Sequence, residues 1–339
     1  MVNKMNEKFE QFNKCLYCGS DGLEYVLSSP DRFSKRDEIF SLYKCLNCGL
    51  AFQNPRVKEV FIGEYYGEGD DLGYYRIPVK KRETLFSKIK SFINKQALIQ
   101  HFNYLKLGKK NIIFFLLSFP FVRIQKINST PDFVVNGKLL EIGCSHGVYL
   151  KKLQDYGWNV VGLEMDKKMT DYAKSLGLDV SSGRIEEADF HDSDFDVVLM
   201  NMVLEHLYNP FENLKKITSW MKPNGQLIFS IPYFNGIEFK IFKEYTYALQ
   251  LPHHITFLNK KIIREYLTKL GYRNIKFYFQ FFDRDVVTSA QFKQVDSNSY
   301  LYKLLGGNKF IRYLFIKPII FLLSLFHMTS RVTVYADKL

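Results

Sequence analysis

A regular alternation of short apolar runs and longer amphipathic segments extends over residues 138–282. Short apolar runs rich in β-branched residues are typical of buried strands, and apolar residues three or four positions apart are typical of helices. The expected strands are 138–142, 159–164, 178–181, 195–200, 225–232 and 275–281, and the expected helices are 147–156, 167–176, 210–221 and 260–270. Because strands and helices alternate, the pattern predicts an α/β fold with a doubly wound, parallel, Rossmann-like sheet.

Two further apolar regions do not belong to this alternation. Residues 85–107 place apolar side chains at helical spacing with lysines on the other side, and the uncharged apolar run 112–122 is too short to span a bilayer. A second apolar region, 310–328, is interrupted by two basic residues and a proline. Residues 331–336 then have the composition of a last strand, which we expect to rejoin the sheet after the excursion 300–330.

The net charge of the chain is concentrated in these extra segments. The 339 residues carry a formal charge of +12, and residues 76–126 alone contain twelve Lys and Arg against one acid, or +11. Residues 300–331 add five Lys and Arg without an acid. Basic, amphipathic stretches of this kind favour contact with an anionic membrane surface. The alternative is that the two segments pack on each other, as a helical subdomain or a dimer face.

Four of the five cysteines form two Cys-x-x-Cys pairs, Cys15 with Cys18 and Cys45 with Cys48. A glycine follows each pair, and 26 residues with two strand-like runs lie between them. Two such pairs converge on one tetrahedral ion, so they predict a zinc ribbon with a structural Zn²⁺, because a catalytic zinc needs an open position. Redox-active cysteines are the alternative.

The cysteine usage also bears on location and organisation. It argues against a disulfide framework and favours a reducing compartment, and the polar, acid-containing first fourteen residues do not resemble a secretory signal. We expect a cytoplasmic protein, peripheral on the inner face of the cell membrane. The expected regions are a zinc ribbon (1–60), a Tyr/Gly-rich loop and basic helical segment (61–134), a Rossmann-like domain (135–284), and a hydrophobic basic excursion with the final strand (285–339). Residues 64–75 within the second region form either a loop that folds over a pocket or a surface connector.

The first predicted strand ends in a turn of small residues, Glu141-Ile-Gly-Cys-Ser-His-Gly147. Such a turn lets the backbone approach a ligand, and a helix that begins near Val148 directs unpaired N–H groups at an anionic group. Glu164 ends the next strand, 23 residues after Glu141, where an acid can accept both hydroxyls of a ribose. The two features together predict a nucleoside-containing cofactor.

Residues 138–282 resemble the class I S-adenosylmethionine-dependent methyltransferases. The resemblance rests on the turn motif, on Gly162-Leu-Glu-Met-Asp166, on Phe195-Asp-Val-Val-Leu-Met-Asn-Met-Val-Leu-Glu-His-Leu207, on Met221-Lys-Pro-Asn-Gly-Gln-Leu-Ile228 and on Gly271-Tyr272. NAD-type Rossmann domains share the glycine turn and the acid but lack the Lys-Pro-Asn-Gly and Glu-His-Leu blocks. The cysteine module, ending in Cys-Gly-Leu-Ala-Phe-Gln-Asn-Pro-Arg, and the segment Pro252-His-His-Ile-Thr-Phe-Leu258 are similar to bacterial methyltransferases of sugar and polysaccharide clusters.

The resemblance implies S-adenosylmethionine as the cofactor and an antiparallel last strand. It also implies which residues surround the cofactor: Glu141, Gly143, Ser145 and Gly147 at the methionine part, Glu164 at the ribose, and Glu186 or Glu187 at the adenine side. Arg184 stands where an aspartate is common in the family.

Methyl transfer from a sulfonium depends mainly on alignment of the nucleophile, and a hydroxyl acceptor also benefits from a base. Histidine, with an unperturbed pKa of ~6.5, suits that role. The candidates are His253 and His254, before the last helix, and His206, after the fourth strand. For His206 the alternative is a structural role in bracing its loop. Some related methyltransferases bind a divalent ion through Glu-x-x-Glu-His, but Met202 occupies the first Glu position, so we do not expect a catalytic metal.

The favoured interpretation is transfer of a methyl group to a hydroxyl or carbon of a sugar in a nucleotide- or lipid-linked glycan. One alternative is an RNA methyltransferase, because a zinc ribbon and a basic segment can bind phosphates. The Phe, Ile and Leu residues interleaved with the basic residues favour a lipid interface instead. A second alternative is a catalytically inactive scaffold on the membrane surface, against which the intact glycine, acid and histidine positions argue.

Overall fold

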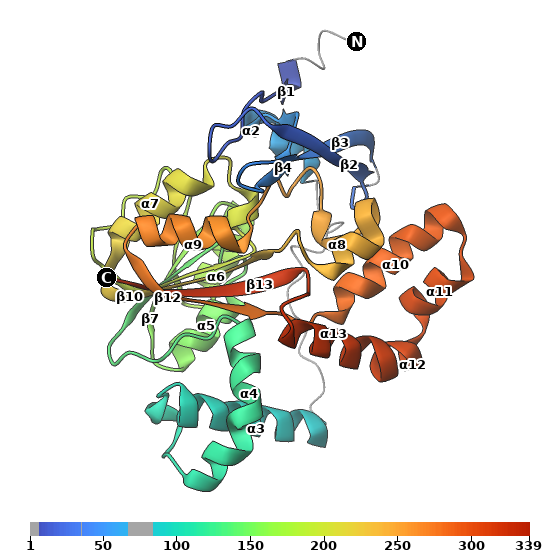
Figure 1. The fold of residues 1–339 in the computed structure, drawn as a ribbon. Coiled ribbons are helices and arrows are strands. Elements are labelled where there is room, and N and C mark those ends of the chain that lie inside the picture. Colours follow the sequence, from blue (N-terminus) through green and yellow to red (C-terminus); the bar gives the residue numbers. More distant parts are fainter. Residues whose placement is uncertain (1–6, 35, 67–83) are drawn as a thin grey trace.

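The computed structural model describes residues 7–34, 36–66 and 84–339 (Figure 1). Most of the predicted Tyr/Gly-rich loop and the first four basic residues of the segment 76–126 lie outside these described residues.

The centre of the molecule is a seven-stranded sheet. Its strands are β6 (Lys138–Ile142), β7 (Asn159–Glu164), β8 (Asp179–Ser182), β9 (Phe195–Asn201), β10 (Met221–Pro232), β12 (Tyr272–Phe279) and β13 (Arg331–Lys338). They lie in the order β12-β13-β10-β9-β6-β7-β8, and β13 is antiparallel to both of its neighbours. The predicted α/β sheet and its antiparallel last strand are therefore confirmed. The sixth strand begins at Tyr272 rather than at 275. The pairing of β12 with β13 shifts its register between Arg273 and Lys276, so the polar residues there remain part of the strand.

Helices cover both faces of this sheet, and the period-2 alternation of the strands decides which residue faces which layer. On β6, Leu140 packs in one hydrophobic cluster with α7 (Pro210–Trp220) and α9 (Lys260–Lys269). Its neighbour Leu139 packs in a second cluster with α5 (Val148–Asp155) and α6 (Lys167–Ser175). Two of these helices begin at a side-chain cap, since Asp166 accepts the N–H of Met169 and Asn259 accepts that of Ile262.

A smaller sheet lies above the first in Figure 1. It contains β2 (Leu23–Asp31), β3 (Arg36–Cys45), β4 (Ala51–Gln53) and β11 (Thr256–Phe257), in the order β11-β4-β3-β2. The N-terminal strands β1 (Phe9–Glu10) and β5 (Arg56–Val57) pair beside it, and α2 (Glu59–Ile62) and η1 (Gly63–Tyr65) follow. Strand β11 comes from the distant segment before α9, so the N-terminal ribbon is completed by a strand from the other domain.

The segment 85–107 forms α3 (Leu85–His101) and η3 (Leu105–Leu107), and the apolar run after it forms α4 (Ile112–Ile127). These two helices extend away from the large sheet, at the bottom of Figure 1. Leu98 and Phe102 of this region pack into the cluster on the face of α5 and α6. The end of α4 is fixed because Tyr335 of β13 donates a hydrogen bond to the carbonyl of Lys126 at 2.9 Å.

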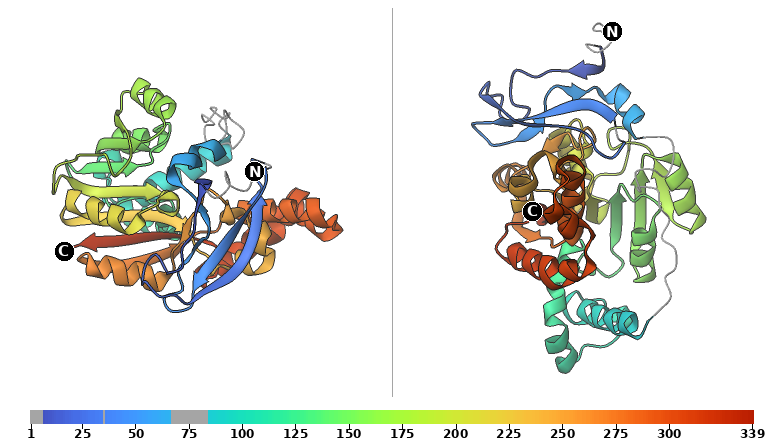
Figure 2. Two further views of the ribbon diagram at one scale, coloured as in Figure 1. Left: turned by 90° about the horizontal axis from the view of Figure 1, so that it is seen from above. Right: turned by 90° about the vertical axis from the view of Figure 1, so that its right-hand side faces the viewer.

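The second excursion forms α10 (Asp283–Ser297), α11 (Tyr300–Gly307), α12 (Lys309–Ile311), η7 (Arg312–Ile316) and α13 (Lys317–Leu325). Val287, Ile316 and Ile320 are the buried centre of its own small cluster. This cluster includes no residue of α3 or α4, so the described parts of the two basic segments do not bury their apolar side chains in one common core. Figure 2 shows the excursion beside the sheet and the helices α3 and α4 below it. Within the described residues, no helix is long and apolar enough to cross a membrane.

Four short elements remain among the described residues. They are η4 (Leu204–His206), α8 (Ile237–Phe242), η5 (Lys243–Tyr245) and η6 (Tyr247–Leu249).

Candidate functional site

The turn between β6 and α5 is a tight left-handed bend. Gly143, Ser145 and Gly147 have φ values of 69°, 49° and 70°. A Cβ on Gly143 would lie 2.6 Å from Cγ2 of Val203, and one on Gly147 would lie 2.5 Å from Cδ1 of Leu178. Both glycines are therefore required by the packing of the turn itself, and Ser145 takes a conformation that few non-glycine residues adopt.

The carboxylate of Glu164 joins this turn to the end of β7. Its Oε2 accepts the backbone N–H of Ser145 at 2.8 Å, and its Oε1 accepts that of Asp166 at 2.9 Å. The structure thus brings together the glycine turn and the strand-end acid that the sequence singled out separately. This is the relative position that a ligand with both an anionic and a ribose part requires.

Glu141 lies inside the same edge of the sheet and is only 4% exposed. Its Oε2 has no hydrogen-bond partner among the described residues, and burial raises its pKa to about 8, while a hydrogen bond from Asn201 acts in the opposite direction. The amide oxygen of Asn201 in turn accepts a hydrogen bond from Ser129 at 2.5 Å. Sequence reasoning missed Asn201, although a polar residue at the end of an otherwise apolar strand was the available signal.

Glu186, predicted on the adenine side, is held by α7 rather than by the turn. Its Oε1 accepts a hydrogen bond from Asn213 at 2.6 Å, and its backbone carbonyl accepts one from Lys216. Arg184, beside it, forms an ion pair with Glu59 of α2. The structure therefore links this loop to the N-terminal ribbon.

The three candidate histidines lie close together between the two sheets. His253 and His254 are each 1% exposed and lie just before β11, with Ile255 between them and the strand, and His206 is half-buried in η4. A ring nitrogen of each lies within hydrogen-bond distance of a backbone carbonyl. His206 Nδ1 bonds the carbonyl of His253 at 3.0 Å, His253 Nε2 that of Tyr65 at 3.0 Å, and His254 Nδ1 that of Ala248 at 2.9 Å. Because a carbonyl only accepts, each of these ring nitrogens carries the proton.

A buried carboxyl group, Glu205, completes this cluster. One oxygen of Glu205 and one ring nitrogen each of His206 and His254 lie within 4.8 Å of one another. Neither carboxylate oxygen has a hydrogen-bond partner among the described residues, and burial raises the pKa of Glu205 to about 8. Burial also lowers the pKa of His206 to about 4 and that of His254 well below its usual value. Neutral imidazoles beside a carboxyl group can accept a proton or hold a cation.

A buried ion pair lies beside Glu205, at the start of β13. Arg331 Nε donates to Asp285 Oδ2 at 2.7 Å, and the positive charge of Arg331 partly opposes the raised pKa of Glu205. Glu238 of α8 is also buried, and burial raises its pKa to about 7. Sequence reasoning did not select these residues, because only the return of β13 to the sheet places Arg331 next to η4 and α8.

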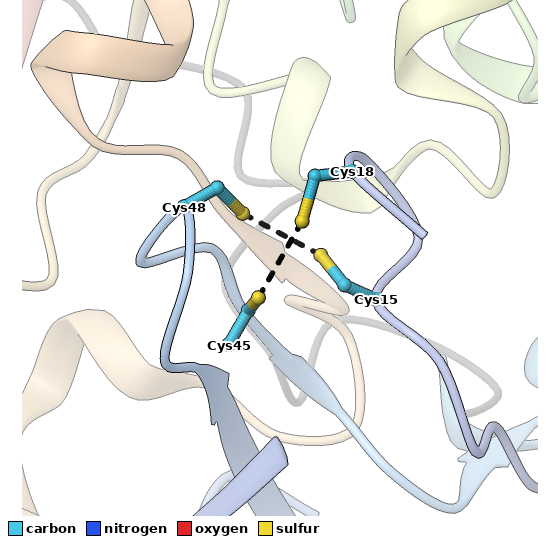
Figure 3. A group of neighbouring side chains, drawn as sticks. All are labelled: Cys15, Cys18, Cys45 and Cys48. Atoms are coloured by element: carbon cyan, nitrogen blue, oxygen red, sulfur yellow. Dashed lines mark hydrogen bonds between the residues drawn. The ribbon is translucent and has the colours of Figure 1, made fainter. Parts of the chain in front are cut away.

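The four predicted cysteine ligands converge (Figure 3). Cys15 Sγ lies 3.5 Å from Cys48 Sγ, and Cys18 Sγ lies 3.6 Å from Cys45 Sγ. Each pair closes a turn in which the glycine after it donates its N–H to the carbonyl of the first cysteine. The sulfur separations fit four thiolates around one tetrahedral ion.

The cysteine cluster is attached to the large domain at two points. Asn259, the cap of α9, donates a side-chain hydrogen bond to the carbonyl of Cys48 at 2.9 Å. Tyr17, between the first two cysteines, packs its ring 4.8 Å from that of Phe211 on α7. The fold of the ribbon therefore fixes the position of the segment that carries His253 and His254.

Comparison with known protein families agrees with this geometry. Residues 120–276 match the family model described as a methyltransferase domain. Among curated proteins, the chain is 27% identical over 173 residues to an uncharacterised protein of Methanocaldococcus jannaschii, which covers 51% of the chain and 77% of that protein. It is 29% identical over 116 residues to the ubiquinone biosynthesis O-methyltransferase of Photobacterium profundum, which covers 32% of the chain and 49% of that enzyme. The match thus spans about half the length of the ubiquinone enzymes.

Among solved structures, the chain is similar to two methyltransferases. A SAM-dependent methyltransferase from Archaeoglobus fulgidus has a TM-score of 0.45 and 20% identity, covering 66% of this chain and 99% of its own. A possible histamine N-methyltransferase from Thermotoga maritima has a TM-score of 0.44 and 15% identity, covering 73% and 99%. From the family match and the arrangement of the turn, Glu164 and the sheet, residues 120–276 are a methyltransferase domain of the S-adenosylmethionine-dependent class.

Proposed function

We propose that this protein transfers a methyl group from S-adenosylmethionine to a hydroxyl, or a carbon, of a sugar in a nucleotide- or lipid-linked glycan. The observation that supports donor binding most strongly is the carboxylate of Glu164, held against the N–H of Ser145 in the glycine turn. This contact holds the acid at the end of β7 beside the left-handed turn, an arrangement in which a strand-end acid can accept the hydroxyls of a ribose.

The donor-binding residues act mainly by position. When bound, S-adenosylmethionine supplies a methyl group that its sulfonium already activates. Gly143, Ser145 and Gly147 shape the turn, Glu164 accepts the ribose hydroxyls, and Glu141 faces the methionine part. Rigid placement of these residues fixes the direction from which an acceptor must approach.

The cluster of Glu205, His206 and His254 supports an acceptor that loses a proton during the transfer. The imidazoles are neutral, because burial lowers the pKa of both histidines, so one of them is available as the base. The characterised relative from Photobacterium profundum is a ubiquinone biosynthesis O-methyltransferase, which favours oxygen over carbon as the methylated atom. The choice of a sugar rests on the resemblance of the cysteine module and of residues 252–258 to methyltransferases of sugar clusters.

We also propose that Cys15, Cys18, Cys45 and Cys48 bind a structural Zn²⁺. The converging sulfurs support this assignment, and all four positions are filled by protein. The ion then fixes β4, which pairs with β11, and so fixes the histidine segment as well.

We place the protein in the cytoplasm, at the inner face of the cell membrane. The exposed apolar side chains of α4 and α13 and the basic residues around them support this location. A lipid-linked acceptor would be presented at that surface.

The test is transfer of radioactive methyl groups from labelled S-adenosylmethionine into separated fractions of nucleotide sugars, lipid-linked glycans and RNA. We expect the label in one of the sugar fractions, and expect His206→Ala or His254→Ala to abolish it without loss of donor binding. Label in RNA alone would overturn the sugar assignment. Donor binding without label in any fraction would favour the inactive scaffold.

A further inference from the structure

A second, basic groove lies at the edge of the large sheet, on β12, and three strands separate β12 from β6, the strand that leads into the glycine turn. It is formed by the start of α9, the outer strand β12 and His327 after α13, and its volume is about 470 Å³. The side chains that line it are Lys260, Lys261, Arg264, Ile275, Lys276, Phe277, Tyr278 and His327. Five of these eight residues are basic or histidine and none is acidic, so the groove suits an anionic ligand.

The cations of the groove are held in place by aromatic rings. Lys260 Nζ lies 5.4 Å from the centre of the Phe279 ring, and the guanidinium of Arg264 lies 5.4 Å from that of Phe277. The ring of His327 also stacks on the ring of Phe279, with the two ring centres 5.0 Å apart. A ring face orients a cation without using its N–H donors, so these donors stay available for an oxygen ligand.

Two exposed apolar surfaces lie on helices that are tied to β12, the strand that lines the groove. Arg123 of α4 donates hydrogen bonds to the carbonyls of Phe279 and Ser324, at 3.0 and 2.9 Å, and so ties α4 and α13 to β12. On α4 the residues that are between 62% and 70% exposed are Ile112, Ile113, Leu116, Leu117 and Phe119. In the last part of the excursion, residues 310–326, the large apolar residues that are at least 51% exposed are Phe310, Tyr313, Leu314, Phe315, Ile319, Leu322 and Phe326. Phe326 directly precedes His327, so the apolar surface continues to the rim of the groove.

We propose that this groove binds the phosphate headgroup of an anionic membrane lipid, while Phe326 and the apolar face of α4 enter the acyl boundary beside it. The inference deepens the membrane location proposed above and rests on it. A phosphate needs several N–H donors at one place, and the groove provides them from α9, β12 and the α13 end. The large apolar surfaces next to it are what distinguishes a lipid from a soluble phosphate or a nucleic acid as the ligand.

The experiment is sedimentation of the full-length protein with phosphatidylcholine vesicles, with and without phosphatidylglycerol. We expect the wild type to pellet with the anionic vesicles and less so as salt rises. The double variant Arg264→Glu/Lys276→Glu should bind them at least about tenfold more weakly. Its matched control is Lys168→Glu/Lys174→Glu on α6, which makes the same change of net charge at exposed positions and should pellet like the wild type.

Two further measurements separate the possible failures. Calorimetry with S-adenosylmethionine should give the same affinity for the groove variant as for the wild type, which shows that the donor site is intact. Calorimetry with inorganic phosphate and with RNA measures whether the groove binds a phosphate group that does not come from a lipid. Equal pelleting of the groove and control variants would overturn the proposal, as would tight binding of phosphate or RNA at the groove without vesicle binding. If the wild type does not bind S-adenosylmethionine, that result contradicts the proposed methyl transfer but not the lipid-binding groove.

Discussion

Oε2 of Glu164 lies 2.8 Å from the backbone nitrogen of Ser145, 19 residues earlier in the chain. The same carboxylate accepts the N–H of Asp166, so it is fixed from both sides before any ligand arrives. A carboxylate that is already oriented loses little side-chain entropy when it binds, and this favours affinity.

Replacement of this carboxylate tests the donor site. Glu164→Gln keeps the size of the side chain but removes the charge and one acceptor, and we expect it to weaken S-adenosylmethionine binding by about 10- to 100-fold, because charge-assisted hydrogen bonds are lost. Titration calorimetry measures this directly. Asp171→Asn, at an exposed position of α6, is the matched control and should leave the affinity unchanged. Equal affinities for the two variants would remove Glu164 from the site.

The glycine turn allows a test of steric strain. Gly143→Ala places a Cβ 2.6 Å from Cγ2 of Val203 at a φ of +69°, and we expect it to lower the free energy of unfolding by about 1–3 kcal/mol. Adding Val203→Ala should recover only part of this loss, because it relieves the clash but not the backbone strain. Urea unfolding of the single and double variants provides the measurement. Full recovery would mean that the conformation at Gly143 tolerates a side chain.

The zinc proposal predicts a metal-dependent stability. Cys48→Ser should abolish the single equivalent of zinc measured by elemental analysis and destabilise the protein by several kcal/mol, on the order seen for structural zinc sites. Cys144→Ala removes the fifth cysteine, which lies outside the cluster, and should retain the zinc. Zinc retained in the Cys48 variant would exclude the four-thiolate site.

The buried carboxyl of Glu205 predicts a pH dependence of stability. Burial raises its pKa to about 8, so the folded protein holds this proton more tightly than the unfolded chain does. Its contribution to stability is therefore complete below the unfolded pKa of ~4.3 and is lost as the pH rises through about 8.

Glu205→Gln removes this titration. Relative to the wild type, we expect the variant to gain on the order of 1–3 kcal/mol of stability between pH 5 and pH 8. Denaturant unfolding at the two pH values measures the difference, with Glu24→Gln at an exposed strand position as the control. A difference between wild type and variant that stays constant with pH would show that Glu205 is already ionised at pH 5.

Much of the fold was predictable because its signals are local. Strands β6 and β7 have the predicted bounds, since an apolar run next to a glycine turn or a capping residue is decided within a few residues of the chain. The convergence of the cysteines was predictable for the same reason, because each Cys-x-x-Cys pair closes its own turn. The helix α10 was not predicted, as its polar and apolar residues show almost no helical periodicity.

The sequence by itself thus determined the α/β domain, the glycine turn and its paired acid, and the four-cysteine cluster, because periodicity and spacing encode them. The antiparallel direction of the last strand was implied by the family resemblance alone. Only the tertiary structure decided that Thr256 pairs with Phe52, which completes the ribbon with a strand from the methyltransferase domain and buries His253 and His254 between the two. It also decided that Arg331 lies near Glu205 and that the apolar faces of α4 and α13 remain uncovered by each other. These relationships join residues that are distant in the chain. They depend on how the whole sheet and its neighbours pack, which no local pattern records.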